Sequence, residues 1–118
     1  EPAGFDDAAR SLAKGERVSN EGGKTSLCDA LLTPTPGALT FPVMKERLAG
    51  GLSVTDEEVQ AAMAYAFTVL KLVVEPGGVV GLAAVLSGKL PVQGRTVAVV
   101  LSGGNVDPDT FTDALKAG

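Results

Sequence analysis

Apolar residues recur at three- and four-residue steps between Val59 and Val74, which predicts an amphipathic helix over this stretch. Thr55 and Glu58 stand just before it with the spacing of a capping box, in which each side chain accepts a hydrogen bond from the other residue's backbone N–H. Several alanines widen the apolar surface, so we expect this helix to be contacted on more than one side. Glu75-Pro76 is expected to end it.

The segment from Pro76 to Gly88 is apolar around its whole circumference until Ser87. A helix of this kind is typical of the interior of a larger body, because it leaves no polar face for solvent. Thr96–Leu101 is rich in β-branched residues and predicts a buried strand. A final helix is expected over Asp107–Ala117, with Pro108 at its first position.

The first half of the chain is more polar, and its pattern predicts short elements separated by turns. Acidic residues stand where the first turn of a helix favours them, and glycines stand where helices end. The elements expected are a helix within residues 1–14 that ends at Gly15, a loop over 16–24 with a short strand at Arg17-Val18, a strand or helix start over 26–32, a helix over 40–48, and an extended stretch over 52–54.

Composition limits the classes of protein to which the chain can belong. Its 118 residues, 45% of them hydrophobic, suit one small globular domain or part of a larger one, and we find no boundary within residues 1–118. A net charge of -4 without any cluster of Lys or Arg argues against nucleic acid as a partner. Because no apolar run approaches about 20 residues, we expect no membrane span.

Two further features concern compartment and chemistry. The single cysteine, Cys28, excludes an internal disulfide and fits the cytoplasm. The absence of histidine excludes Ser-His-Asp hydrolysis and His-rich zinc sites. Since the chain starts at Glu1 without a methionine, we expect it to be a piece of a longer polypeptide.

Candidate chemistry gathers where the predicted strand ends, at Ser102-Gly103-Gly104-Asn105. In open α/β sheets, ligands bind at the carboxyl edge, where glycines let the backbone approach them and a helix N-terminus follows. Ser102 is therefore the first candidate for a ligand contact. The alternative is that these residues only form a turn, since both glycines permit a positive φ.

Four landmarks, read in order along the chain, resemble the pyridoxal-phosphate serine/threonine dehydratase and serine racemase family. They are Glu1-Pro2-Ala3-Gly4-Phe5-Asp6-Asp7, Asp29 followed by Thr33-Pro34-Thr35-Pro36-Gly37 and Phe41-Pro42, Leu72-Val73-Val74-Glu75-Pro76, and Val100-Leu101-Ser102-Gly103-Gly104-Asn105-Val106-Asp107. The resemblance covers the C-terminal portion of the family's catalytic polypeptide. It implies an α/β fold, in which residues 1–118 form part of the large domain of a fold-type II enzyme, an open sheet flanked by helices.

The resemblance also implies an activity for the parent protein. That activity is the elimination of water from serine, threonine or a hydroxylated aspartate, followed by release of ammonia to give a 2-oxo acid. Two alternatives stay open: a serine racemase-type isomerase, and a non-catalytic α/β binding or assembly module that has kept the scaffold. By the same resemblance we expect a small amino acid as substrate, a homodimer for the full enzyme, and a cytoplasmic location.

For the cofactor, pyridoxal 5'-phosphate, the resemblance implies a hydrogen bond between the Ser102 hydroxyl and the pyridine nitrogen, with Gly103 beside it. A neutral hydroxyl does not hold that nitrogen protonated as an aspartate would, so the ring withdraws electrons less completely. Glu75 is expected close to this site, or else serves as an ordinary carboxylate at a helix start. No Ser-x-Lys-x-Arg-Gly segment or glycine-rich phosphate loop is present, so the N-terminal half of the same enzyme is the expected partner and the isolated chain is expected to be inactive.

Two further sites are implied by the resemblance. A divalent cation, Mg²⁺, Ca²⁺ or Mn²⁺, would be held by the carboxylates of Glu1 and Asp7 and the main-chain oxygen of Phe5, since hard oxygen donors suit these ions. The alternative is that both acids cap the first helix. An effector nucleotide would bind at Lys71 and Asn105, or these are a solvated lysine and a turn-forming asparagine.

Overall fold

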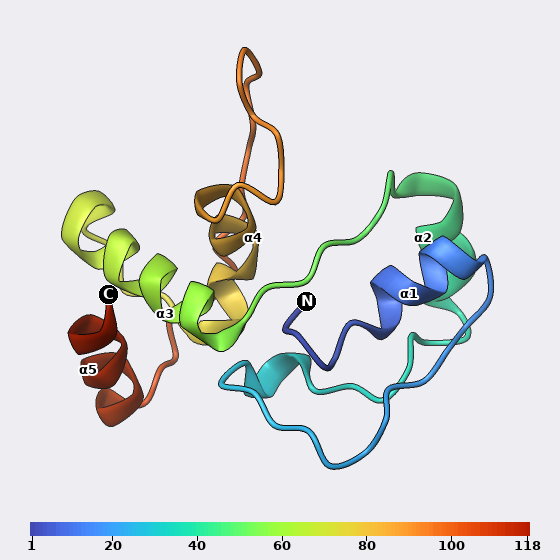
Figure 1. The fold of residues 1–118 in the computed structure, drawn as a ribbon, viewed down its shortest axis with the longest axis horizontal. Helices are drawn as coiled ribbons and strands as arrows, with labels where there is room; N and C mark the ends of the chain where they lie inside the picture. The colour runs from blue at the N-terminus through green and yellow to red at the C-terminus, as the bar shows by residue number, and fades with distance from the viewer.

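The computed structural model describes residues 1–118 as two groups of helices joined by irregular segments (Figure 1). One group contains α3, α4 and α5, and the other contains α1 and α2. The bounds are α1 Asp7–Lys14, the 3₁₀-helix η1 Asp29–Leu31, α2 Thr40–Arg47, α3 Asp56–Tyr65, the π-helix η2 Ala66–Leu70, α4 Pro76–Leu86 and α5 Pro108–Ala117.

The capping box predicted before α3 is confirmed. The Glu58 backbone N–H donates to Thr55 Oγ1 at 3.3 Å, and the Thr55 N–H donates to Glu58 Oε2 at 2.8 Å. The expectation that α3 is contacted on more than one side is also confirmed, because it packs against both α4 and α5. Ala62, Ala64 and Ala66 are buried, and their small side chains let the neighbouring helices approach closely.

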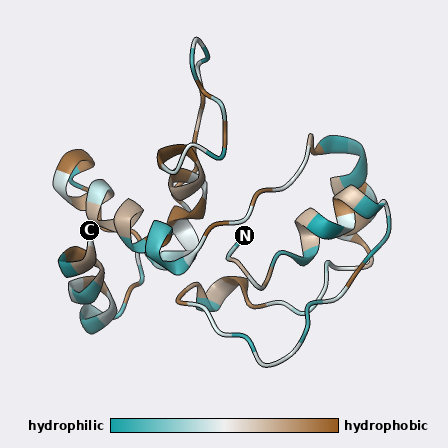
Figure 2. Ribbon diagram, in the orientation of Figure 1, coloured by the Kyte–Doolittle hydropathy of each residue, from teal (hydrophilic) through white to brown (hydrophobic).

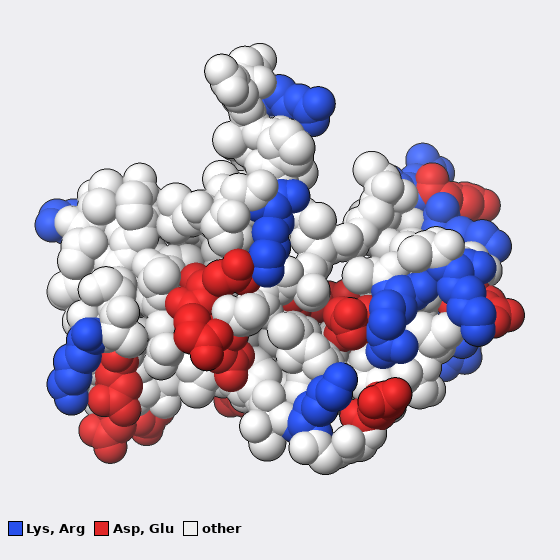
Figure 3. All heavy atoms as spheres, viewed as in Figure 1, with Lys and Arg blue, Asp and Glu red and all other residues white.

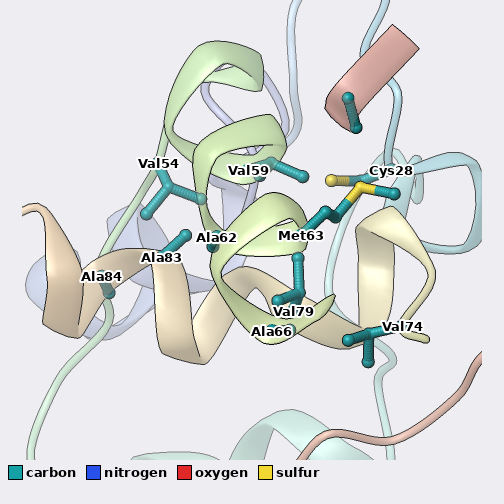
Figure 4. Close-up of a cluster of buried hydrophobic side chains, with 11 residues drawn as sticks. Cys28, Val54, Val59, Ala62, Met63, Ala66, Val74, Val79, Ala83 and Ala84 are labelled. Atoms are coloured by element: carbon teal, nitrogen blue, oxygen red, sulfur yellow. The ribbon is translucent and has the colours of Figure 1, made fainter. Parts of the chain in front are cut away.

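The hydrophobic core is built around α3 and α4. Its eleven buried residues are Cys28, Val54, Val59, Ala62, Met63, Ala66, Val74, Val79, Ala83, Ala84 and Ala114. In the close-up, the side chains of Met63 and Cys28 point toward each other (Figure 4). Cys28 precedes η1, so this contact joins the first half of the chain to the main group of helices.

The predicted end of the helix that begins at Asp56 is wrong. Instead of continuing to Val74, α3 passes into η2, which ends at Leu70. Lys71 then adopts a left-handed conformation with φ of 61°, and the Leu72 N–H donates to the Ala66 carbonyl, which closes the helix. Residues 72–75 consequently run as an irregular segment toward the start of α4.

The predicted apolar helix forms as α4, and only one of its sides is covered. Val79, Ala83 and Ala84 are buried, whereas Gly81 and Leu86 are exposed. Figure 2 shows α4 as one of the most hydrophobic elements of the chain. A groove of about 330 Å³, lined mainly by apolar residues, lies between α4 and residues 97–100. We expected α4 to be buried all round, but within these 118 residues it is buried on only part of its surface.

The predicted open sheet does not form within these residues. Thr96–Leu101 makes no backbone hydrogen bond to another segment, and Val97 and Val100 are 39% and 81% exposed. The strand expected at Arg17-Val18 is also absent, and the only β pairing is an isolated bridge between Pro2 and Val54. The reason is that a strand needs a partner for its N–H and C=O groups, and no other segment here supplies one.

The remaining predictions for the first half largely hold. Helices form at both expected places, as α1 and α2, and Gly15 ends α1 with a φ of 77°. Of the two possibilities left open for residues 26–32, the structure has a single helical turn, η1. The helices of the chain include none that is long and apolar enough to cross a membrane.

The cap of α3 is also tied to the end of α4. Lys89 Nζ lies 2.6 Å from Glu58 Oε2 and donates to the Ser53 carbonyl at 2.9 Å. Acidic side chains gather over the start of α3, next to a basic side chain (Figure 3). The hydrogen bond from Lys89, together with that from the Thr55 backbone, lowers the pKa of Glu58 from its ordinary value of 4.5.

We expect Thr55→Ala to lower the free energy of unfolding of the full-length protein by about 1 kcal/mol, because the Glu58 N–H loses its capping partner. Chemical denaturation measures the change. Thr112→Ala is the control, since it removes an exposed hydroxyl from α5 that makes no hydrogen bond. Equal stability of Thr55→Ala and the unaltered protein would contradict the prediction.

The lowered pKa of Glu58 predicts a pH dependence. Because the folded-state pKa lies below the unfolded value, the stabilisation by Glu58 is complete above about pH 4.5 and is lost as the pH falls through the folded-state pKa. The difference in melting temperature between the unaltered protein and Glu58→Gln should therefore be largest near neutral pH and shrink in acid. Glu46→Gln, at an exposed position without an ion pair, is the control; a difference for Glu58→Gln that does not change with pH would refute the assignment.

Candidate functional site

Ser102 lies at the surface, where its hydroxyl makes no hydrogen bond to the protein. It borders a hollow of about 310 Å³ lined by residues 72–74 and 101–104. A hydroxyl in this position is free to bond a molecule that enters the hollow. The geometry is thus compatible with the ligand contact predicted for Ser102.

The turn that carries Ser102 is held against the start of α4. The Glu75 N–H donates to the Gly103 carbonyl at 3.0 Å. The Glu75 side chain lies directly against Gly103, where a Cβ would be 2.9 Å from its Cδ atom. A Cβ on Gly104 would come within 2.7 Å of the Val73 carbonyl oxygen.

These contacts change the explanation for the two glycines of the turn. Neither Gly103 nor Gly104 has a positive φ, so the turn does not use the left-handed backbone that glycine permits. A Cβ at position 104 would overlap the Val73 main chain, and a Cβ at position 103 would overlap the Glu75 side chain where it now lies. These restrictions depend on a segment about thirty positions earlier in the chain, and no local sequence signal could have revealed them.

Glu75 occupies the N-cap position of α4 without making a side-chain hydrogen bond to its backbone. It borders a second hollow, of about 220 Å³, which is also lined by Asp29, Asn105 and Asp107. The structure therefore places Glu75 beside Gly103 and brings Asp29 and Asn105 to the same surface. Pro76, which also borders this hollow, fixes the first turn of α4.

Lys71 borders neither hollow. Its ammonium group donates to the Thr68 carbonyl at 2.7 Å, and its side chain is exposed at the end of η2. Asn105 borders the second hollow, so the structure does not place the two residues in one pocket. A nucleotide site formed by Lys71 and Asn105 stays a prediction.

The residues predicted to hold a cation lie at the start of α1. Both oxygens of the Glu1 carboxylate accept backbone hydrogen bonds, from Ala8 at 3.0 Å and from Ala9 at 2.7 Å. Asp7 is only 2% exposed, and its Oδ1 accepts a hydrogen bond from Asn20 at 2.7 Å. Glu1 therefore caps α1, the alternative considered for it, and no cluster of three His, Cys, Asp or Glu side chains that could hold a metal occurs in the chain.

The donor chemistry at this place nevertheless fits a hard cation. The carboxylates of Glu1 and Asp7 and the carbonyl of Phe5 all belong to residues 1–7. The Phe5 carbonyl oxygen, which lies outside the helices, accepts no backbone hydrogen bond. Hard oxygen donors of this kind suit Mg²⁺, Ca²⁺ or Mn²⁺. For Glu1 to act as a ligand, its oxygens would have to be shared with the N–H groups of Ala8 and Ala9.

No lysine lines either of the two hollows near Ser102. Five of the six make contacts elsewhere: Lys14 pairs with Glu16, Lys45 donates to the Gly15 carbonyl, Lys71 donates to the Thr68 carbonyl, Lys89 binds Glu58 and Lys116 pairs with Asp113. The chain therefore supplies a hydroxyl, glycines and carboxylates to this surface, and no amine.

Comparison with known proteins gives a consistent result. The profile of the family described as "Pyridoxal-phosphate dependent enzyme" matches residues 1–103. The chain is 38% identical to serine racemase of Dictyostelium discoideum over 98% of its own length, and 38% identical to L-threonine ammonia-lyase of Thermotoga maritima over 92%. It superposes on the crystal structure of the T.th. threonine deaminase with a TM-score of 0.81 and 42% identity, over 90% of this chain and 35% of that one. The chain spans 36% of the racemase and 26% of the ammonia-lyase.

Proposed function

The chain belongs to the pyridoxal-phosphate dependent enzyme family, and we propose that it is the C-terminal portion of an ammonia-lyase that acts on serine, threonine or a hydroxylated aspartate. Such an enzyme eliminates water from the amino acid and then releases ammonia, which leaves a 2-oxo acid. The relatives named L-threonine ammonia-lyase and L-threo-3-hydroxyaspartate ammonia-lyase support this reaction class. The observation that carries the proposal is the exposed Ser102 hydroxyl at the edge of a hollow.

Ser102 would hold the pyridine nitrogen of the cofactor by a hydrogen bond. When bound, pyridoxal phosphate supplies an aromatic ring that withdraws electrons from the substrate's α-carbon. A serine hydroxyl bonds the nitrogen without the negative charge of an aspartate, which limits that withdrawal. Gly103, in the same turn, and Glu75, at the start of α4, would border the cofactor, since the Glu75 side chain lies against Gly103.

We also propose that the open sheet forms in the full-length protein. Val97 and Val100 are exposed, the backbone of Thr96–Leu101 is unpaired, and the adjacent groove is apolar. These features suit a strand whose neighbours come from other parts of the protein. The N-terminal half of the same enzyme would supply them, together with the lysine and the glycine-rich phosphate loop.

A racemase is the second candidate function, favoured by the 38% identity to serine racemase of Dictyostelium discoideum. The proposed Ser102 contact suits either reaction, because both begin at the α-carbon of an amino acid. Incubation of the full-length protein with L-serine and L-threonine separates them: a lyase produces a 2-oxo acid, and a racemase produces the D-enantiomer. A folded protein that binds the cofactor and forms neither product would instead support the non-catalytic module.

Ser102→Ala tests the cofactor contact in the full-length protein. We expect the dissociation constant for pyridoxal phosphate to rise about five- to tenfold, the effect of losing one neutral hydrogen bond, and elimination to slow. Titration followed by the absorbance of the bound cofactor measures the change. Ser102→Thr retains a hydroxyl and should restore much of the affinity, and Ser19→Ala, at an exposed serine whose side chain makes no hydrogen bond, is the control. Unchanged affinity and rate in Ser102→Ala would count against the contact.

A divalent cation at Glu1, Phe5 and Asp7 is the second part of the proposal, supported by the donor chemistry of these residues. A cation present at one hundred times its dissociation constant would add about 2.7 kcal/mol to the stability of the folded state. Chelation should therefore lower the melting temperature of the full-length protein, and added Mg²⁺, Ca²⁺ or Mn²⁺ should restore it. The same treatment should leave Asp7→Asn unchanged; a melting temperature of the unaltered protein that is insensitive to chelator would argue against the site.

A further inference from the structure

Gly78 lies inside the first turns of α4, where nothing in its backbone conformation requires glycine. Its φ is not positive, and glycine in a helix is less favourable than alanine. The residue is buried, and a Cβ placed on it would lie 2.9 Å from the carbonyl oxygen and 3.0 Å from the nitrogen of Gly103. The 2.9 Å distance is shorter than a Cβ atom tolerates, and the 3.0 Å distance is tighter than most Cβ contacts, so the Gly103 main chain would have to shift.

The contact between Gly78 and the Gly103 main chain limits how closely α4 can approach the turn that carries Ser102. The neighbouring hydrogen bond from the Glu75 N–H to the Gly103 carbonyl, at 3.0 Å, forms at the same place. At the next residue of the turn, Gly104 lies against the Val73 carbonyl, where a Cβ would be only 2.7 Å from the oxygen. The turn is thus in contact with main chain at both Gly103 and Gly104, so an added methyl group at position 78 would displace it.

We propose that Gly78 is a positioning residue for Ser102: the missing side chain at position 78 lets the Ser102-Gly103-Gly104 turn lie against α4 and so fixes where the hydroxyl is presented. This inference rests on the proposed contact between Ser102 and the cofactor. Gly78 itself touches only Gly103 and Glu75 of the site, and it acts through the turn.

The neighbouring glycine provides a matched control. A Cβ on Gly77 would lie 3.5 Å from both Ala30 Cβ and Leu31 Cγ, which are ordinary van der Waals distances. Gly77→Ala therefore adds the same methyl group to the same helix turn without displacing the Ser102 turn. We expect it to leave cofactor affinity unchanged.

The test is a double-mutant cycle in the full-length protein, with Gly78→Ala, Ser102→Ala and the double variant, read out as the dissociation constant for pyridoxal phosphate. We expect Gly78→Ala to weaken binding about five- to tenfold, as Ser102→Ala does, since the displaced hydroxyl loses its hydrogen bond. Because both changes remove one interaction, the double variant should bind no more weakly than Ser102→Ala alone.

Hydrogen exchange of the cofactor-free protein gives a second readout that is independent of the cofactor. Gly78→Ala should speed exchange of the Glu75 amide, which loses the Gly103 carbonyl, whereas Gly77→Ala should not. Unaltered exchange at Glu75 in Gly78→Ala would show that the turn has not moved and would overturn the inference.

The outcomes separate the inference from the function on which it rests. Unchanged affinity in Ser102→Ala defeats the proposed contact and the inference with it. If Gly78→Ala binds pyridoxal phosphate normally while Ser102→Ala binds it weakly, the inference about Gly78 fails and the Ser102 contact stands. The same conclusion follows if the losses of affinity add in the double variant. If Gly78→Ala does not give a cooperative melting transition, Gly104→Ala displaces the turn at its contact with the Val73 carbonyl, and the same outcomes apply to it.

Discussion

The close approach between the Ser102 turn and the start of α4 is the constraint on which the candidate site depends. Gly78 and Gly104 leave room for main chain to lie against main chain, and one hydrogen bond from the Glu75 N–H to the Gly103 carbonyl joins the two segments. Main-chain atoms have fewer ways to move than side chains, so a contact of this kind defines position closely. The exposed hydroxyl therefore sits on a rigid support and not on a free loop.

Small side chains also organise the helices around the site. Because α3 carries alanines on several sides, α4 and α5 both pack against it. Its first turn is capped by Thr55 and Glu58, and Lys89 links that cap to the segment after α4. The π-helix and the left-handed Lys71 then end the helix early, which directs residues 72–75 past Gly104 and into α4.

The outer side of α4 and the unpaired Thr96–Leu101 segment share one property: both are apolar and neither is fully covered. Burial of apolar surface is the main favourable term in folding, so such a surface is favourable only when another part of a protein lies against it. Membership of the pyridoxal-phosphate dependent enzyme family, and the fraction of each relative that the chain spans, agree with this requirement.

The features that the sequence determined by itself depend on residues that are close together in the chain. The capping box of α3, the ends of α1 and α4 and the apolar character of α4 depend on residues a few positions apart, and each could be predicted from the chain. The tertiary structure alone decided the rest. Thr96–Leu101 has the composition of a strand but forms none without a partner, and Glu1 caps α1 because the fold brings it to that helix's first N–H groups. The glycines at 78, 103 and 104 are explained by contacts between segments far apart in sequence, which no local pattern records.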